Sequence, residues 1–276
     1  MKISLEDKAI VVTGAGTGLG RAYASALGEA GARLVVNDVE EDSLRSVAEA
    51  ISAAGGEVII HVGSVADWDD VATLTSTCLG AFGKMDGLVN NAAVHHAASP
   101  LDESEPQLRR IVEINVLGSL FPAIHAFRVM AAQGNGKILN VTSGAHIGLL
   151  GLTAYGTTKG AVASLTYNLS LEGARVGVQV NALAPVAQTL MSPLEERPDG
   201  LSRPQPEQVA PVVVYLMSDA ARINGQVVRY DGRSVSLLAQ PHFRTSRVTD
   251  GIDTPEGIAR AFESTLEASN VTVGLY

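Results

Sequence analysis

A glycine-rich segment follows directly after the first apolar run of the chain. Ala9–Val12 is short, apolar and largely β-branched, and Thr13–Gly20 then contains four glycines before a helical pattern begins. Glycine lets the backbone turn tightly and approach a pyrophosphate closely, and the helix that follows offers free N–H groups to the anion. A strand, a glycine turn and a helix in this order predict a dinucleotide-binding crossover, which restricts the chain to few folds.

Apolar runs and helical patterns continue to alternate after this turn. Near-continuous apolar strands are typical of a parallel sheet covered on both faces, and right-handed crossovers make such a sheet doubly wound. We therefore predict an α/β protein with a single doubly wound Rossmann domain, a seven-stranded, mainly parallel sheet and helices on both faces. The predicted strands are 9–12, 33–37, 58–62, 87–90, 137–142, 176–182 and 226–230, and the predicted helices are 21–29, 41–54, 67–82, 105–131, 154–171, 206–218 and 255–266.

The length of 276 residues allows two domains, but α/β folds of this size often form one. We predict a single dinucleotide-binding domain over 1–276, with 233–276 as an ordered C-terminal extension. Residues 192–206 are rich in Pro, Glu, Arg and Ser and interrupt the α/β pattern. We interpret them as a lid at the mouth of the site or as a polar connector.

The net charge of −9 argues against nonspecific binding to nucleic acid or to an anionic membrane. Glu6 and Asp7 interrupt any signal-type apolar run, and we find no window of about 20 apolar residues, the length of a membrane helix. The single cysteine, Cys78, excludes an intrachain disulfide and is expected to fill space inside a helix. We therefore expect a cytoplasmic protein without a metal site.

Asp38 closes the second predicted strand, where a carboxylate accepts hydrogen bonds from the adenosine ribose hydroxyls. The same carboxylate repels a 2′-phosphate, and neither Thr17 nor Val39 supplies the positive charge that such a phosphate needs. We therefore predict NAD rather than NADP. Ser64 and Val65 follow the third strand and are expected at the adenine. The segment Asn91-Ala92-Ala93 ends the fourth strand with small residues that let a cofactor lie close to the backbone.

Tyr155 and Lys159 lie four residues apart in a segment predicted to be helical, so they share one face. A nearby ammonium favours the ionised phenol, so we expect Lys159 to lower the pKa of Tyr155. A phenol tuned in this way can exchange a proton near neutral pH. The spacing is common by chance, and its weight comes from the nucleotide site that precedes it in the chain.

Together these motifs resemble those of the short-chain dehydrogenases/reductases over nearly the whole chain. The matching pieces are Thr13-Gly14-x-x-x-Gly18-x-Gly20, Asn90-Asn91-Ala92, Asn115, Ser143, Tyr155-x-x-x-Lys159 and Asn181-x-x-Ala184-Pro185. Three positions depart from the usual pattern, and none of them removes a catalytic group. Ala93 replaces a common glycine, Val186 stands where Pro-Gly is more usual, and Ser64 stands where an aspartate often meets the adenine.

The resemblance implies four catalytic residues. Tyr155 exchanges a proton with the substrate oxygen, and Lys159 lowers the pKa of Tyr155 and holds the nicotinamide ribose. Ser143 hydrogen-bonds the substrate oxygen, and Asn115 holds a water that relays protons from Lys159. The resemblance also implies a small-molecule alcohol or ketone substrate and a homo-oligomer, a tetramer or dimer. The implied cofactor-binding residues are Gly14, Thr17, Gly18, Leu19, Gly20, Asp38, Ser64, Val65, Asn91, Ala92, Ala93, Tyr155, Lys159, Pro185 and Val186.

Within this family, the C-terminal part of the chain resembles one branch in particular. This branch is the (3R)-hydroxyacyl-CoA dehydrogenase unit of peroxisomal-type multifunctional enzymes. We expect oxidation of a 3-hydroxyacyl thioester, or of a steroid-like secondary alcohol, with NAD. Arg244 and Arg247 either meet a CoA diphosphate or are solvated, and the apolar segment 147–152 lines a substrate pocket or belongs to the core. The loop histidines 95, 96 and 146 follow the carboxyl ends of predicted strands, so they either face the pocket or are solvated or structural, and we expect no direct chemical role for them. The alternatives are an NADPH-dependent 3-oxoacyl ketoreductase and a non-catalytic dinucleotide-binding regulator.

Overall fold

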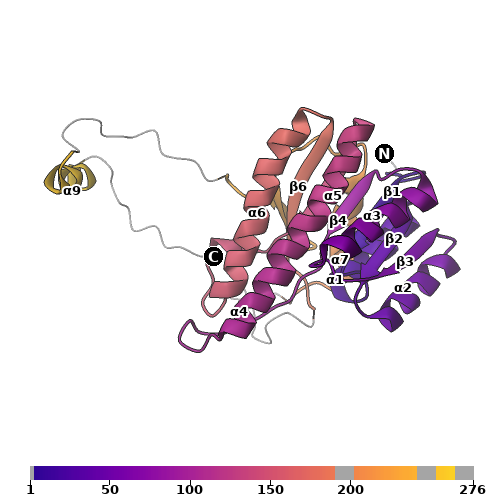
Figure 1. Ribbon diagram of the computed structural model, residues 1–276, viewed down its shortest axis with the longest axis horizontal. Helices are drawn as coiled ribbons and strands as arrows, with labels where there is room; N and C mark the ends of the chain where they lie inside the picture. Colours follow the sequence, from indigo (N-terminus) through magenta and orange to yellow (C-terminus); the bar gives the residue numbers. More distant parts are fainter. Residues whose placement is uncertain (1–2, 190–201, 241–252, 265–276) are drawn as a thin grey trace. The chain divides into compact units, whose positions relative to one another are not determined.

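The computed structural model describes residues 3–189, 202–240 and 253–264, and its centre is a sheet of eight strands (Figure 1). The strand order is β3-β2-β1-β4-β5-β6-β7-β8, and every neighbouring pair is parallel except β7 and β8. This order confirms the predicted doubly wound α/β fold. The strands are β1 Ala9–Thr13, β2 Arg33–Asp38, β3 Val58–Val62, β4 Gly87–Asn90, β5 Gly136–Val141, β6 Val178–Pro185, β7 Val227–Tyr230 and β8 Val235–Leu237.

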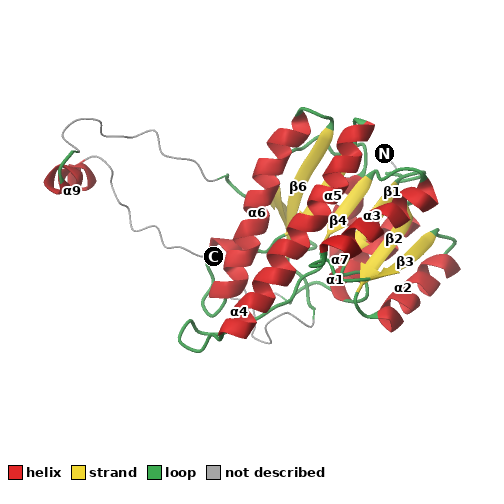
Figure 2. Ribbon diagram, in the orientation of Figure 1, coloured by secondary structure: helices red, strands yellow, loops and turns green. Residues whose placement is uncertain are grey.

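Helices cover both faces of the sheet, and each face has its own apolar core (Figure 2). One core packs α1 and α2 with α7 and α8, and the other packs α3 with α5 and α6. Alternate strand residues divide between the two cores, as Val11 and Val12 do in β1. The helices of this body are α1 Gly18–Glu29, α2 Glu41–Ala53, α3 Trp68–Phe82, α4 Glu105–Val112, α5 Gly118–Gln133, α6 Thr153–Ala174, α7 Pro206–Val209 and α8 Pro211–Met217.

The fold differs from the prediction in one strand and in two helices. The sheet gains an eighth strand, β8, which runs antiparallel to β7 within the predicted C-terminal extension. The predicted helix 105–131 is interrupted by a π-helical turn, Glu113–Leu117, between α4 and α5. Such turns insert one extra residue per turn and often occur at functional sites, and this one carries Asn115.

The predicted helix over 206–218 is two short helices, because α7 ends at Val209 and α8 begins at Pro211. Proline has no N–H to continue the first helix, and it is favoured at the first position of the second. The helix expected at the C-terminal end is present as α9, Pro255–Ser264.

The chain falls into two compact units, one ending at Leu238 and the other beginning at Ala239. The first unit contains the whole sheet and all three apolar clusters. Of the second unit, residues 239–240 and 253–264 are described, and they include helix α9. The prediction of one domain over 1–276 stays a prediction.

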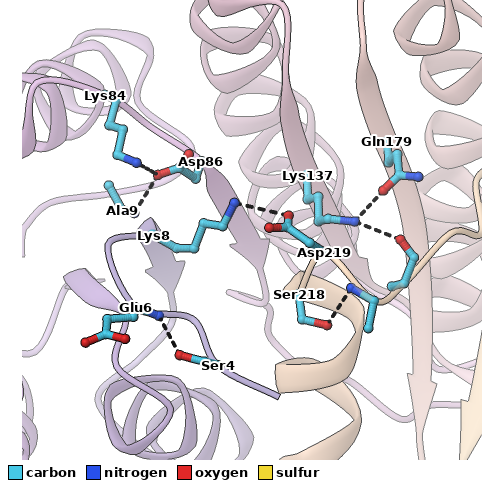
Figure 3. A network of polar contacts seen from close by, with 12 residues as sticks. Ser4, Glu6, Lys8, Ala9, Lys84, Asp86, Lys137, Gln179, Ser218 and Asp219 are labelled. Carbon is cyan, nitrogen blue, oxygen red and sulfur yellow. Dashed lines mark hydrogen bonds and ion pairs between the residues drawn. The ribbon is translucent and has the colours of Figure 1, made fainter. Parts of the chain in front are cut away.

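Charged side chains tie together the amino ends of the strands (Figure 3). Lys8 pairs with Asp219 at 3.1 Å, and Lys84 pairs with Asp86 at 3.0 Å, while Asp86 also accepts from the N–H of Ala9 at 2.8 Å. These contacts hold β1 and β4 to the segment after α8. The sequence motifs for the cofactor and the chemistry lie at the opposite, carboxyl edge of the sheet.

Helices α4 and α5 with the π-helical turn between them form one helical run, Glu105–Gln133. Among the described residues it is the single helix long and apolar enough to cross a bilayer by length and composition, a test that core helices of other proteins also pass. Its residues Ala123, Ala126 and Met130 are buried in the core beneath the sheet. The run is therefore explained by packing within this fold.

Candidate active site

The glycine turn between β1 and α1 fits a dinucleotide phosphate. Gly14 and Gly18 have positive φ angles of 61° and 53°, and a Cβ at Gly20 would lie 1.9 Å from the carbonyl oxygen of Gly14. The space beside Gly18 is open, because the nearest atom to an added Cβ is 4.0 Å away. Thr17 caps α1 without a side-chain hydrogen bond, so the first N–H groups of the helix remain available to an anion.

Asn91 holds the glycine turn against the end of β4. Its side-chain amide donates to the carbonyl oxygens of Thr13 and Gly14, both at 3.1 Å. The hydroxyl of Thr13 in turn accepts from the N–H groups of Asn91 and Ala92 at 3.0 and 3.1 Å. A Cβ at Gly14 would lie 2.7 Å from the Cα of Ala92. Asn91 and Ala92, directly after β4, therefore help to shape the glycine turn.

Asp38 lies at the end of β2, beside the glycine turn. Its Oδ2 accepts from the N–H of Gly16 at 2.9 Å, and its Oδ1 accepts from the N–H of Val39 at 2.8 Å. These bonds fix the carboxylate at the edge of the turn. The nearby cations are engaged elsewhere, because Arg21 pairs with Glu207 at 3.4 Å and Arg45 pairs with Glu41 on α2.

The remaining predicted cofactor positions occupy the same carboxyl edge. The N–H of Ser64 donates to Asp70 at 2.8 Å, so a carboxylate is present beside this position although residue 64 is not acidic. Val65 is buried, and an added Cβ at Gly118 would lie 2.6 Å from its side chain. Pro185 ends β6, and the N–H of Val186 donates to the carbonyl oxygen of Tyr230 at 2.9 Å.

Ser143, Tyr155 and Lys159 come together where β5 ends and α6 begins. Ser143 directly follows the Val141-Thr142 end of β5 and caps a short 3-10 turn, accepting from the N–H of Ala145 at 3.2 Å. A side-chain hydrogen bond joins Ser143 to Tyr155. The Lys159 ammonium lies 5.7 Å from the centre of the Tyr155 ring, so both helical residues share one face of α6 as expected.

Burial sets the protonation of Tyr155 and Lys159. It raises the pKa of Tyr155, and the hydrogen bond with Ser143 opposes this change. The net change in the pKa of Tyr155 is therefore opposite to the lowering expected from the sequence, because burial outweighs the opposing effect. Burial also lowers the pKa of Lys159 to about 8. Its ammonium donates to the carbonyl oxygen of Val141 at 2.9 Å.

Asn115 is fully buried in the π-helical turn, and its side chain holds the loop after β4. Its Oδ1 accepts from the N–H of Val94 at 2.8 Å, and its Nδ2 donates to the carbonyl oxygen of Val94 at 2.9 Å. Nδ2 also donates to the hydroxyl of Thr158 at 3.1 Å. Asn115 therefore joins this loop to α6, next to Tyr155.

Sequence reasoning missed one side chain at the centre of the site. His95 is half-buried, and its imidazole lies 4.8 Å from the ring of Tyr155, tilted by 56°. Its position shortly after the Asn90-Asn91 motif, beyond the carboxyl end of a predicted strand, was the one signal for it in the sequence, and we expected no direct chemical role.

Part of the prediction falls outside the described residues. Arg244 and Arg247 lie there, as do residues 192–201 of the predicted lid. Leu149 and Leu150, in the apolar segment before Tyr155, are exposed rather than part of the core. Within the described ranges, no cluster of three His, Cys, Asp or Glu side chains is suited to hold a metal ion.

A family model for short chain dehydrogenases matches residues 8–195. The chain is 36% identical over 240 residues to the cis-4-hydroxycyclohexanecarboxylate dehydrogenase of Sinomonas cyclohexanicum, covering 82% of this chain and 96% of that protein. It is 33% identical over 238 residues to the peroxisomal multifunctional enzyme type 2 of Drosophila melanogaster, covering 82% of this chain and 39% of that longer protein. A crystal structure of a short chain dehydrogenase from Mycobacterium avium superposes with a TM-score of 0.87 at 31% identity, covering 99% of both chains.

The chain therefore belongs to the short-chain dehydrogenase/reductase family. It is an oxidoreductase that uses a nicotinamide dinucleotide, NAD or NADP, and acts on alcohols or ketones. The predicted resemblance to the peroxisomal multifunctional enzymes is confirmed by the similarity to the Drosophila protein.

Proposed function

We propose that the protein is an NAD-dependent dehydrogenase of secondary alcohols. The observation that carries the cofactor preference is the Asp38 carboxylate, fixed at the glycine turn by the N–H groups of Gly16 and Val39 at 2.9 and 2.8 Å. At this position a carboxylate accepts hydrogen bonds from ribose hydroxyls and repels a 2′-phosphate. The nearest cation along the chain, Arg33, lies at the opposite end of β2, and Arg21 and Arg45 form exposed ion pairs with Glu207 and Glu41.

Four side chains would perform the proton chemistry. When bound, the nicotinamide accepts or supplies the hydride. Tyr155 gives or takes the proton at the substrate oxygen, and Ser143, hydrogen-bonded to Tyr155, orients that oxygen. Lys159 holds the nicotinamide ribose, and its ammonium favours the phenolate once the site binds its ligands. Asn115 fixes the loop after β4 through its bonds to Val94. From this position it would support the path by which the proton leaves.

The other predicted cofactor contacts belong to the same proposal. The glycine turn and the N-terminus of α1 would hold the pyrophosphate, and Ser64 and Val65 would meet the adenine. Residues 91–93 and 185–186 would border the nicotinamide half. These assignments are supported by the place of each residue at the carboxyl edge of the sheet.

The cofactor assignment is tested by Asp38→Ala. Loss of the carboxylate removes the ribose contacts and the repulsion, so Kd for NAD should rise about tenfold while Kd for NADP falls. Titration of protein fluorescence with each cofactor measures both constants. Glu49→Ala is a matched control that removes another exposed carboxylate of α2. If Asp38→Ala weakened NADP binding more than NAD binding, the assignment would be reversed.

The substrate is proposed to carry an apolar group beside its alcohol. Leu149 and Leu150 are exposed just before Tyr155, and the neighbouring loop after β4 exposes Leu101. The N–H of Ala98 donates to the carbonyl oxygen of Gly151 at 2.9 Å, which joins these two loops. A 3-hydroxyacyl-CoA and a steroid-like alcohol both fit this description. A kinetic screen that adds cyclic hydroxy acids, suggested by the Sinomonas relative, separates the three classes.

A second candidate is an NADPH-dependent 3-oxoacyl ketoreductase. It is favoured by 30% identity over 240 residues to a 3-oxoacyl-[acyl-carrier-protein] reductase of Thermotoga maritima. Reduction of a 3-oxoacyl thioester by NADPH but not NADH would select it. A third reading is a dinucleotide-binding regulator, which requires NAD binding with no absorbance change at 340 nm on any alcohol or hydroxyacyl-CoA.

We further propose that the protein is a cytoplasmic homo-oligomer, a dimer or tetramer. The support is the family relationship together with apolar side chains exposed on α6 and β8, such as Leu171 and Val235. Light scattering after size-exclusion chromatography measures the mass, and a monomer at micromolar concentration would contradict the assembly.

A further inference from the structure

His95 lies in the loop between β4 and α4, and the chain holds this loop on both sides of it. On one side, both backbone groups of Val94 bond to the Asn115 amide at 2.8 and 2.9 Å. On the other side, the N–H of Ala98 donates to the carbonyl oxygen of Gly151 at 2.9 Å. His96, the next residue, bonds through Nε2 to Glu103 at 2.9 Å. An irregular loop held at three points gives its side chains fixed positions.

The side chain of His95, between these contacts, meets the catalytic phenol. The His95 imidazole is half-buried, with its ring centre 4.8 Å from that of Tyr155 and a tilt of 56°. Tilted aromatic pairs at this separation attract each other beyond the effect of the area that they bury. Burial and the neighbouring His96 lower the pKa of His95, so the imidazole is neutral at physiological pH and does not add charge to the site.

The same network reaches Tyr155 from the backbone. Asn115 Nδ2 donates to the hydroxyl of Thr158 at 3.1 Å, and that hydroxyl donates to the carbonyl oxygen of Tyr155 at 2.8 Å. One buried amide thus fixes the turn of α6 that carries the phenol and the loop that carries the imidazole. Ser143 holds the phenol through a side-chain hydrogen bond, and His95 contacts its ring.

We propose that His95 is a positioning residue for the reaction: its imidazole, placed by the bonds between Asn115 and Val94, holds the ring of Tyr155 in the orientation that reaches the substrate oxygen. This inference rests on the proposed function, in which Tyr155 exchanges that proton. An acid or base must lie within hydrogen-bonding reach of the atom that it serves, and a misplacement of about 1 Å costs up to ~100-fold in rate. His95 acts through the ring contact, so another flat ring can replace it.

The test is a set of variants assayed for kcat and for both KM values. His95→Ala should lower kcat about tenfold and leave KM for the cofactor within about twofold of the wild type, because the contact is made to Tyr155 and not to the glycine turn. His95→Phe keeps a ring and should recover kcat to within about threefold. His125→Ala is a matched control, because it removes an imidazole that contacts Trp68 at 4.2 Å in the same way. It should keep the wild-type kcat.

A double variant separates this inference from the proposed function. If His95 acts through the Tyr155 hydroxyl, His95→Ala should slow Tyr155→Phe by less than about twofold, since the two changes are then not additive. A wild-type kcat for His95→Ala, or a His95→Phe variant as slow as His95→Ala, would overturn the positioning role alone. A wild-type rate for Tyr155→Phe would overturn the proposed function. Matching circular dichroism melting curves exclude misfolding as the cause.

Discussion

At the scale of single residues, the buried ammonium of Lys159 destabilises the fold, and its position beside Tyr155 explains why it is there. It is 2% exposed, and burial lowers its pKa to about 8. The ammonium has one hydrogen bond among the described residues, to the carbonyl oxygen of Val141, and no carboxylate beside it. A buried charge without a counter-charge destabilises a fold. We infer that the protein tolerates this cost because the residue serves the chemistry at Tyr155.

Lys159→Met should therefore stabilise the protein while it abolishes turnover. The neutral, similarly long side chain removes the buried charge, and we expect a gain on the order of 1–2 kcal/mol at pH 7, reduced by the lost bond to Val141. Because the folded pKa lies below the unfolded value of about 10.4, the unfolded state binds more protons between about pH 8 and 10.4. Wild-type stability should rise with pH in that window, and the advantage of Lys159→Met should shrink. Urea denaturation at pH 7 and pH 9.5 measures both.

The residue roles differ in how far the sequence predicts them. Four site residues can be placed at one edge of the sheet from local pattern and the resemblance to the family. Their spacing along the sequence, relative to the glycine motif and to each other, matches the family motifs: they are Asp38, Ser143, Tyr155 and Lys159. His95 has no such signal, because its contact depends on Asn115, which lies 20 positions later in the chain and bonds across space to Val94. The pKa of Tyr155 was predicted in the wrong direction, since burial is not visible in a motif.

At the scale of elements, the glycine turn joins packing to function. Gly20 begins the second half of the first turn of α1, and an added Cβ would meet the carbonyl oxygen of Gly14 at 1.9 Å and the amide of Asn91 at 2.6 Å. Gly18 faces open space on the same turn. Gly20 therefore lets the helix approach the turn closely. Gly18 leaves room in which a ligand can approach the backbone.

Gly20→Ala should destabilise the protein by about 1–3 kcal/mol, because the turn must move away to admit the methyl group. The same movement should weaken NAD binding. Gly80→Ala in α3 is the matched control, since no atom lies within 4 Å of the added Cβ, and it should stabilise the protein by about 0.5–1 kcal/mol through helix propensity. Thermal unfolding compares the two. A Gly20→Ala protein as stable as Gly80→Ala would contradict the packing argument.

Long apolar elements were predictable from the sequence, and the short ones were not. The strands β1 to β7 and the major helices follow from apolar runs and helical periodicity, because each buries side chains on a sheet face. Strand β8 has three residues, all exposed, and forms through backbone bonds to β7 across a short turn, so it has no buried face that an apolar pattern would show. The π-helical turn at 113–117 likewise has no local signal, because Asn115 is held there by the loop after β4.

At the scale of the whole molecule, the first compact unit contains everything that the cofactor site needs. The sheet closes at β8, where the N–H of Leu238 donates to the carbonyl oxygen of Val227 at 2.9 Å. All three apolar clusters are formed by residues up to Leu238. The glycine turn, Asp38 and the Tyr155 helix belong to the same unit. Folding and cofactor binding are therefore expected to depend on this unit alone.

A chain ending after Gln240 should melt within about 3 °C of the full protein, since it keeps all three apolar clusters and 1 kcal/mol corresponds to about 2–4 °C at this size. Its Kd for NAD should stay within about threefold, as measured by fluorescence titration. A chain ending after Asp231 is the matched control. It also removes β8, leaves the β7 backbone groups on that side unpaired, and should melt well below the full protein.

If the chain ending after Gln240 fails to fold or to bind NAD, the segment after Gln240 is part of the same folding unit, as a single domain over 1–276 requires. Turnover by the shortened chain is a separate measurement: unchanged NAD binding with a raised KM for the alcohol would assign the C-terminal unit to the substrate.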